Sequence, residues 1–287
     1  MRGKAVLADL WSLTKPGITR LVLVTTGVGF YLGASGSLDL ALLFHVLLGT
    51  GLLAGGTNAL NQFAERRADA QMKRTSRRPL PAGRLQASTA LVFSSGISAA
   101  GALYLVALVN LLTAALGVAS LLIYIFVYTP LKRRTWLCTI VGAVPGALPP
   151  MMGWTAATGR LDALAWVLFG IVFLWQMPHF FAIGWMYKQD YARAGFLMLP
   201  VVDGDGKRTS RQIIIYTLAL VAVSLLTTVM GLTGAIYFVG ASSLGLAFLV
   251  LGFALAVRRT GGRARRLFLG SVLYLPVLLI LMVVDKV

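Results

Sequence analysis

The sequence predicts an all-α, polytopic membrane protein with about nine transmembrane helices, for three reasons. Hydrophobic residues make up 58% of the 287 residues and charged residues only 12%, and the mean hydropathy is +0.82, far from the balance of soluble domains. The apolar residues form long runs without the alternation of a β-barrel strand. In lipid, such a chain must satisfy its backbone hydrogen bonds within each segment, which selects helices.

Nine apolar segments account for the predicted spans, and each is close to the roughly 20 residues that a bilayer requires. We expect them to form one intramembrane domain over residues 1–287. The fifth segment is rich in Gly and Pro, so we expect an irregular helix that either walls a pocket or packs closely on its neighbours. The segments cover residues 20–37, 41–63, 88–108, 111–129, 136–156, 163–187, 212–232, 235–257 and 267–284, and the Gly and Pro residues are Gly142, Pro145, Gly146, Pro149, Pro150 and Gly153.

The basic residues predict the orientation in the membrane. Of 26 Lys and Arg, 24 lie in five clusters that recur after every second apolar segment, at residues 2–20, 66–84, 132–134, 188–211 and 258–266. The positive-inside rule places these clusters in the cytoplasm, with the amino terminus inside and the carboxyl terminus outside. We expect an integral protein of a bacterial inner or plasma membrane. Topology thus explains the net charge of +17, and no nucleic-acid partner is expected.

Two sequence features exclude other architectures. The single cysteine, Cys138, rules out an internal disulfide framework and a clustered thiolate metal site. No small-residue cleavage pattern follows the first apolar stretch, so we expect that stretch to stay in the mature protein as a helix and not to be a signal peptide.

Two long cytoplasmic connections, residues 64–87 and 188–211, are the predicted active-site loops because they hold five of the nine acidic residues beside many basic ones. Asn61, Glu65 and Asp69 are spaced i, i+4, i+8. They form one stripe if the second helix continues past the membrane surface. Carboxylate and amide oxygens suit a Mg²⁺ ion that bridges to substrate phosphates. The alternative is an amphipathic helix end with solvated charges.

A dense basic run follows the stripe and contains Lys73, Arg74, Arg77 and Arg78. Such cations can bind phosphate oxygens, although a topogenic charge cluster would explain about half of them. In the second connection, Asp190 lies at the expected membrane surface. It could supply a carboxylate to the same metal site or to a second one.

These motifs together resemble the UbiA superfamily of intramembrane prenyltransferases and, within it, the haem O synthase family. The resemblance covers most of the chain. It implies nine helices around a central cavity and two acidic motifs that bind an isoprenoid diphosphate through Mg²⁺. The stripe falls on the first motif, but Asp190 is the only carboxylate at the second, because Met186 and Ala194 stand four residues to either side. The matching runs are residues 14–16, 58–69, 72–75, 78–81, 128–133, 142–154, 175–180, 190–195 and 198–200.

The resemblance also implies a reaction. The farnesyl group of farnesyl diphosphate joins a vinyl group of haem B, and water addition gives haem O and diphosphate; haem B is therefore a substrate and not a cofactor. Mg²⁺ and nearby cations would stabilise the leaving diphosphate. The implied metal ligands are Asn61, Glu65, Asp69 and Asp190, and the implied catalytic cations are Lys73, Arg77, Lys132 and Arg133.

Substrate contacts and partners follow from the same resemblance. Aromatic faces would stabilise the allylic cation. His179 is the candidate haem contact, since haem iron commonly binds an imidazole, although it could instead hydrogen-bond a neighbouring helix. The implied downstream partners are haem A synthase or terminal oxidase assembly. The substrate-binding residues are Asn58, Arg74, Arg78, Tyr128, His179, Phe180 and Tyr191.

Two other functions fit parts of the sequence. A UbiA-type prenyltransferase could act instead on a quinone precursor or a chlorin. A membrane transporter of anionic substrates, a different class, would place polar residues at several depths of its spans. Here the polar residues collect at one face, which favours an active site.

Overall fold

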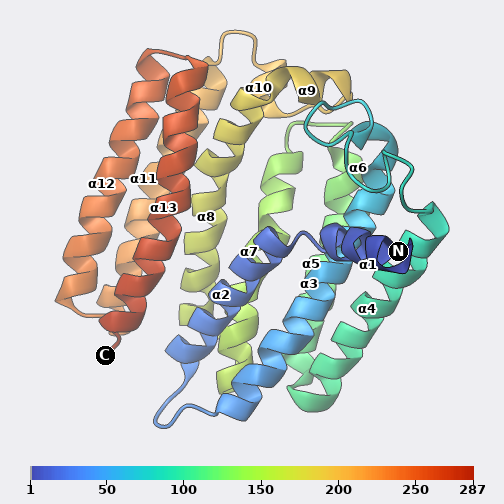
Figure 1. Ribbon diagram of the computed structural model, residues 1–287. Helices are drawn as coiled ribbons and strands as arrows, with labels where there is room; N and C mark the ends of the chain where they lie inside the picture. The colour runs from blue at the N-terminus through green and yellow to red at the C-terminus, as the bar shows by residue number, and fades with distance from the viewer. Residues whose placement is uncertain (1) are drawn as a thin grey trace.

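The computed structural model describes residues 2–287, with side chains from residue 5 onward. The predicted all-α class is confirmed: these residues contain no β-strand, only one isolated bridge between Thr233 and Lys286. Nine long helical segments make up most of the described chain, and Figure 1 shows how they are arranged. They are α2 (Pro16–Gly33), α3 (Leu40–Asp69), α4 (Ala87–Leu108), the joined α5 (Leu111–Leu122), η1 (Ile123–Tyr128) and α6 (Thr129–Leu131), α7 (Cys138–Thr158), α8 (Ala163–Met186), α11 (Lys207–Val229), α12 (Ala235–Val257) and α13 (Gly261–Val284).

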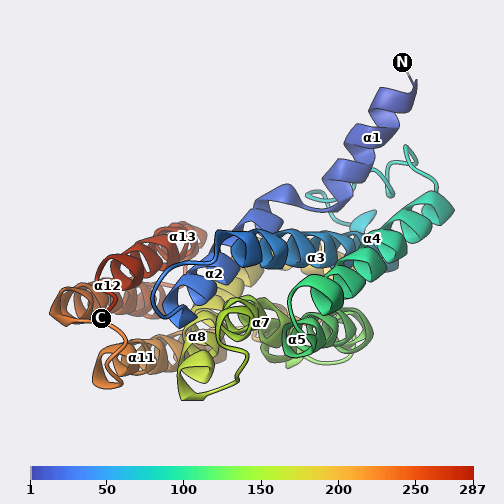
Figure 2. The ribbon, with the colours of Figure 1, turned by 90° about the horizontal axis from the view of Figure 1, so that it is seen from below.

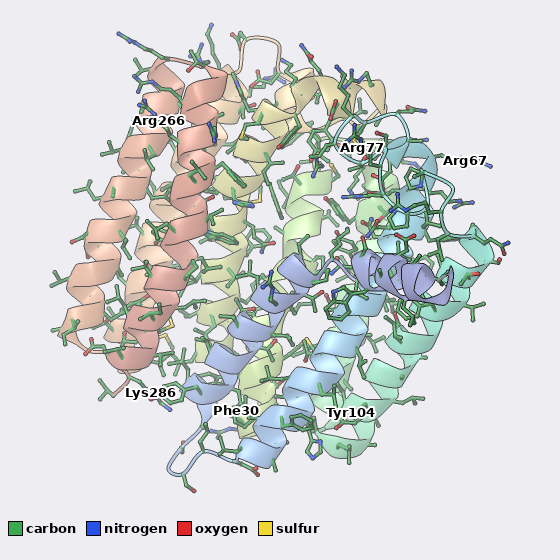
Figure 3. All side chains as sticks on the ribbon, viewed as in Figure 1. Phe30, Arg67, Arg77, Tyr104, Arg266 and Lys286 are labelled. Atoms are coloured by element: carbon green, nitrogen blue, oxygen red, sulfur yellow. The ribbon has the colours of Figure 1, made fainter. Side chains whose placement is uncertain are left out.

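Consecutive long helices run in opposite directions, so the loops alternate between two ends of the bundle (Figure 1). The basic clusters after α3, α6, α8 and α12 all lie at one end, which we call the basic end. Figure 3 labels Arg67, Arg77 and Arg266 there, and Tyr104 and Lys286 at the opposite end. The basic clusters of the sequence thus come together at the basic end of the folded molecule.

Seven of the nine segments are long and apolar enough to cross a membrane, and α2 and α7 fall short by composition. These two helices pack closely on each other. A Cβ atom at Gly29 would lie 2.0 Å from the carbonyl oxygen of Pro150, and one at Gly153 would lie 1.9 Å from that of Thr26. Small residues allow such close backbone approach between membrane helices. The sides of α2 and α7 that face each other therefore contact protein and not lipid, so these two helices can be less apolar than the other seven.

Several helices extend past the apolar runs that predicted them. α3 continues to Asp69, α11 begins at Lys207 and α13 at Gly261. The hydropathy pattern locates only the lipid-facing part of a helix, and charged residues can continue the same hydrogen-bond ladder outside the bilayer. Three short helices near the basic end were not predicted. They are α1 (Arg2–Leu13), which projects away from the bundle beside α3 and α4 (Figure 2), α9 (Lys188–Arg193) and α10 (Leu199–Val202).

The expectation of an irregular fifth span was wrong, because α7 is a continuous helix. A neighbouring side chain satisfies one of the carbonyl groups that proline leaves free. Pro149 has no N–H to donate to the carbonyl of Pro145, and the Ser120 hydroxyl donates to that oxygen over 3.2 Å. The irregular span is the fourth, where residues Ile123–Tyr128 form a π-helix. Such π-helical turns often mark functional sites.

Candidate active site

A polar cavity of about 190 Å³ lies at the basic end, where α3, η1, α8 and the loops meet. The predicted stripe of Asn61, Glu65 and Asp69 lines it. α3 carries all three, since it remains helical past the membrane surface. The side chains are buried, with exposed fractions of 1%, 8% and 1%. The stripe is therefore not a solvated helix end, which was the alternative.

Each carboxylate of the stripe is paired with a cation from another part of the chain. Lys132 Nζ lies 2.5 Å from Glu65 Oε1, and Arg78 Nη1 lies 2.8 Å from Asp69 Oδ2. Burial alone would lower the pKa of Lys132, but the Glu65 carboxylate reverses this and raises it well above its ordinary value. Both cations line the cavity. The site thus holds fixed positive charge beside its oxygen ligands.

The second carboxylate oxygen of Asp69 is the feature that best fits a metal ion. Asp69 Oδ1 is buried and has no hydrogen-bond partner among the described residues, which is costly for a charged group. No cluster of three or more Asp, Glu, His or Cys side chains within residues 2–287 could hold an ion by itself. Mg²⁺ commonly keeps several waters and binds through one or two carboxylates plus substrate phosphates. The donor set agrees with that mode of binding.

Lys15 is a cavity residue that was not among the predicted site residues. Its Nζ donates to Asn61 Oδ1 over 2.9 Å. The backbone of Lys15 is left-handed, with φ of 48°, and it is the only non-glycine residue of the described chain with positive φ. Burial, together with the Arg78 guanidinium, lowers the pKa of Lys15 to about 7. The sequence signal that could have indicated Lys15 as a site residue was its position directly before Pro16 at a membrane surface. Its strained backbone fits such a role, since strain is often kept at functional sites.

Asp190 holds the loop after α3. Its Oδ2 accepts the backbone N–H of Arg74 over 3.2 Å, and its Oδ1 pairs with Arg193. Burial would raise the pKa of Asp190, but the Arg74 N–H and the Arg193 guanidinium outweigh it and keep the pKa below its ordinary value. Of the described residues, those lining the polar cavity include Arg74 and Tyr191 but not Asp190. The two predicted loops therefore meet through this carboxylate.

The remaining predicted cations fall into two groups. Arg74 and Arg78 line the polar cavity, and Arg74 Nη2 also donates to the Tyr191 hydroxyl over 3.3 Å. Lys73, Arg77 and Arg133 are exposed and are not among the lining residues of the described chain. The sequence could not separate these groups, because a loop without regular structure gives no periodicity from which to infer a face.

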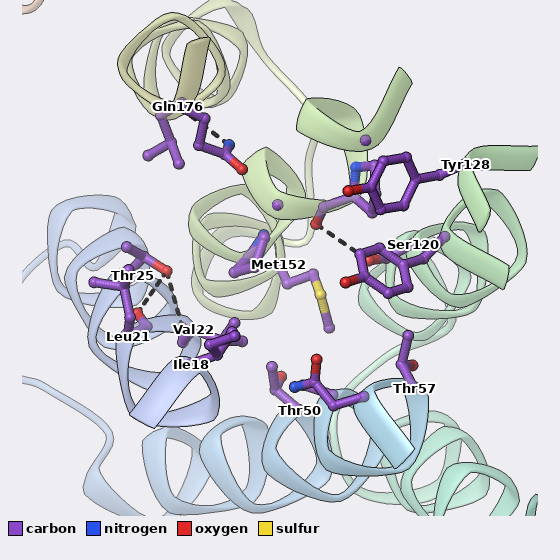
Figure 4. A pocket seen from close by; sticks show the side chains of 18 of the residues that line it. Ile18, Leu21, Val22, Thr25, Thr50, Thr57, Ser120, Tyr128, Met152 and Gln176 are labelled. Atoms are coloured by element: carbon purple, nitrogen blue, oxygen red, sulfur yellow. Dashed lines mark hydrogen bonds between the residues drawn. The ribbon is translucent and has the colours of Figure 1, made fainter. Parts of the chain in front are cut away.

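A second, apolar cavity of about 310 Å³ adjoins the first, and Figure 4 shows side chains that line it. Five residues line both cavities: Ile18, Tyr124, Tyr128, Phe180 and Ile183. The π-helical turn carries Tyr124 and Tyr128, whose ring centroids are 5.1 Å apart. The aromatic rings therefore lie at the junction between the charged cavity and the apolar one.

The predicted residues Asn58 and His179 line the apolar cavity, as do Gly142 and Pro145 of α7. Asn58 Nδ2 donates to the Thr14 carbonyl and to the Thr19 hydroxyl, so it also ties α3 to the start of α2. The Gly and Pro residues of α7 thus serve both roles considered for them, since Gly142 walls the pocket and Gly153 allows close packing.

Comparisons with known proteins agree with this architecture. The model of the UbiA prenyltransferase family matches residues 22–276. The chain is 52% identical to a protoheme IX farnesyltransferase of Solibacter usitatus, over 98% of this chain and 99% of that protein. It is 42% identical to a protein of the same name from Koribacter versatilis, over 98% and 94%. A solved UbiA homolog from Archaeoglobus fulgidus bound to GPP and Mg²⁺ has a TM-score of 0.69 at 17% identity, covering 96% of this chain and 99% of that one, and shares the fold.

Proposed function

This chain belongs to the UbiA prenyltransferase family, and on that premise we propose that it transfers farnesyl from farnesyl diphosphate to a vinyl group of haem B. Water addition completes haem O, and diphosphate is released. The observation that carries the proposal is that a cation-rich cavity adjoins an apolar one, with aromatic residues that line both. An amphiphilic diphosphate needs both environments. The choice of haem B rests on relatives named protoheme IX farnesyltransferase.

Asn61, Glu65 and Asp69 would hold Mg²⁺ at the diphosphate, with Asp190 as a further proposed ligand. The unpartnered Asp69 Oδ1 supports this assignment. When bound, the ion would supply Lewis-acid neutralisation of the leaving diphosphate. Asp190 also fixes the loop that carries Arg74, so it would act on diphosphate binding through that loop as well. The related UbiA homolog bound to GPP and Mg²⁺ supports a metal-dependent site of this kind.

The cations of the cavity would bind the phosphate oxygens and stabilise the charge that grows on them as the C–O bond breaks. Lys132, Arg78, Arg74 and Lys15 line the cavity and are our first candidates. Lys73, Arg77 and Arg133 remain proposed catalytic cations, and in the described chain they are exposed and do not line the cavity. Because Lys132 and Arg78 pair with Glu65 and Asp69, they are already positioned before substrate arrives.

The aromatic junction would receive the allylic carbon. Tyr128 and Phe180 line both cavities, and the ring of Tyr128 already faces a cation, with Lys132 Nζ 4.4 Å from the ring centroid. A desolvated cation–π contact contributes about 2 kcal/mol. Tyr191 of the polar cavity is the third proposed aromatic contact. The apolar walls would exclude water until the new carbon–carbon bond has formed.

The activity test uses the purified full-length protein with labelled farnesyl diphosphate and Mg²⁺. We expect label to enter haem B and not 4-hydroxybenzoate, and we expect EDTA to abolish the transfer. Label in 4-hydroxybenzoate, or in a chlorin offered in place of haem B, would replace the haem assignment with another acceptor. Uptake of an anion into vesicles without any transfer would favour the transporter.

The orientation is a second proposal with its own test. We propose that the basic end is cytoplasmic, because loops rich in Lys and Arg stay on that side. Reporter fusions near residues 75, 133, 200 and 262 should report cytoplasm, and fusions near residues 36, 159 and 287 should report the outside. An outside signal at residue 75 would invert the arrangement.

A further inference from the structure

The imidazole of His179 is held by groups on two helices. Its Nδ1 lies 2.7 Å from the hydroxyl oxygen of Ser271 on α13. Its ring stacks on Trp175, one turn earlier on α8, with centroids 5.1 Å apart and an interplanar angle of 24°. Phe268 of α13 also contacts the imidazole, and the centroids of these two rings are 5.1 Å apart. α8 and α13 pack against each other here, as Figure 1 shows. The ring is therefore fixed in place and in orientation.

The hydrogen bonds of Ser271 determine which nitrogen of His179 carries the proton. The Ser271 hydroxyl donates to the backbone carbonyl of Phe268 over 2.6 Å. A hydroxyl has one hydrogen, so the same oxygen can only accept at its contact with His179. Nδ1 must then be the donor, and the neutral ring has its lone pair on Nε2.

The Nε2 atom has no hydrogen-bond partner within residues 2–287, and it is not one of their buried, unpartnered polar atoms. His179 lines the apolar cavity. Its lone pair is thus accessible in a cavity that otherwise offers few strong ligands. Trp175 adds to the arrangement, since its Nε1 donates to the backbone carbonyl of Ser271 over 2.8 Å and fixes α13 at this level.

We propose that Ser271 is a positioning residue that holds His179 as the Nδ1–H tautomer, so that Nε2 can bind the iron of the haem substrate. The inference rests on the proposed function. Histidine ligands of metals typically donate their second N–H to a neighbouring group, which fixes the tautomer and strengthens the ligand. The two roles considered for His179, iron ligand and partner of a neighbouring helix, are then served by its two nitrogens.

The test is resonance Raman spectroscopy of ferrous haem B bound to the full-length protein in detergent. The wild-type protein should show an iron–histidine stretching band. Ser271→Ala should shift this band to lower frequency, because Nδ1 loses its acceptor, and should weaken haem binding by about tenfold. The KM for farnesyl diphosphate should not change. The matched control is Ser94→Ala, since Ser94 is also fully buried and its hydroxyl bonds only within its own helix.

A second variant covers the case in which Ser271→Ala does not fold. His179→Gly should abolish the iron–histidine band, and added imidazole should restore it. An unchanged band in Ser271→Ala, or a band that survives in His179→Gly, would overturn the inference even with farnesyl transfer intact. Failure of the proposed function looks different, because the wild-type protein would then transfer no farnesyl to haem B under any of these conditions.

Discussion

Replacing Asp69 with Asn is expected to lower farnesyl transfer by about a hundredfold or more. The amide keeps the size of the side chain but removes a ligand charge from the site where Oδ1 has no hydrogen-bond partner among the described residues. A metal ion at a leaving group contributes several kcal/mol, and each ~1.4 kcal/mol is a factor of ten in rate. Glu65→Gln should have a similar effect. Turnover measured across a Mg²⁺ titration would show both the loss and a higher Mg²⁺ requirement.

The control for these variants is Asp205→Asn. Asp205 is an exposed carboxylate at the same end of the bundle, paired with Lys207 outside the cavity. It should retain near-normal turnover. All three proteins should elute as folded monodisperse species in detergent, but Glu65→Gln and Asp69→Asn each leave a cavity cation unpaired and should unfold at a lower temperature than the wild-type protein. Near-normal turnover in both Asp69→Asn and Glu65→Gln would remove the α3 stripe from the mechanism.

Lys132→Met is expected to destabilise the protein by about 3–5 kcal/mol. Both side chains of the Lys132–Glu65 pair are more than nine-tenths buried, and removing one partner leaves an uncompensated buried charge. Methionine keeps most of the aliphatic stem, so the loss of stability would come mainly from the missing charge. Thermal unfolding in detergent, with and without farnesyl diphosphate and Mg²⁺, would measure it. Farnesyl transfer should also fall, since a cavity cation is lost.

The exposed neighbour provides the comparison for this variant. Arg133→Met removes a cation that no acidic side chain of the described chain pairs with, and it should change stability by less than about 0.5 kcal/mol. The double variant Glu65→Gln/Lys132→Met should recover much of the stability lost in Lys132→Met, because no unpaired charge remains. Equal stability of Lys132→Met and Arg133→Met would contradict a strongly coupled buried pair.

Much of the fold was predictable because the local amino-acid composition indicates where each membrane span lies. Long apolar runs located all nine long helices, and the spacing of Asn61, Glu65 and Asp69 predicted their common face, since a helix fixes which residues share a side. The end of α3 was not predictable from hydropathy, because its last turns are charged. The regularity of α7 was missed because local composition does not show a donor from another helix, such as Ser120, which satisfies a carbonyl freed by proline.

The pairings inside the site were beyond sequence analysis for a similar reason. Lys15 and Asn61 are 46 residues apart, and Lys132 and Glu65 are 67 residues apart. The residue type at one position does not show which distant side chain that residue will contact. Asp190 illustrates this best: its charge and its place at the surface were predicted, but its contact with the N–H of Arg74 depends on how two irregular loops fold together.

The pairing of cations with carboxylates in the polar cavity has a consequence for the order in which ligands bind. Among the residues that the structure describes, its charged lining consists of four cations, Lys15, Arg74, Arg78 and Lys132, and only two acidic residues, Glu65 and Asp69. A divalent ion entering alone meets surplus positive charge, and a diphosphate entering alone meets cations already engaged by carboxylates. Arriving together, each ligand removes the obstacle to the other. Thermodynamic linkage then requires that diphosphate tighten Mg²⁺ binding by the same factor as Mg²⁺ tightens diphosphate binding.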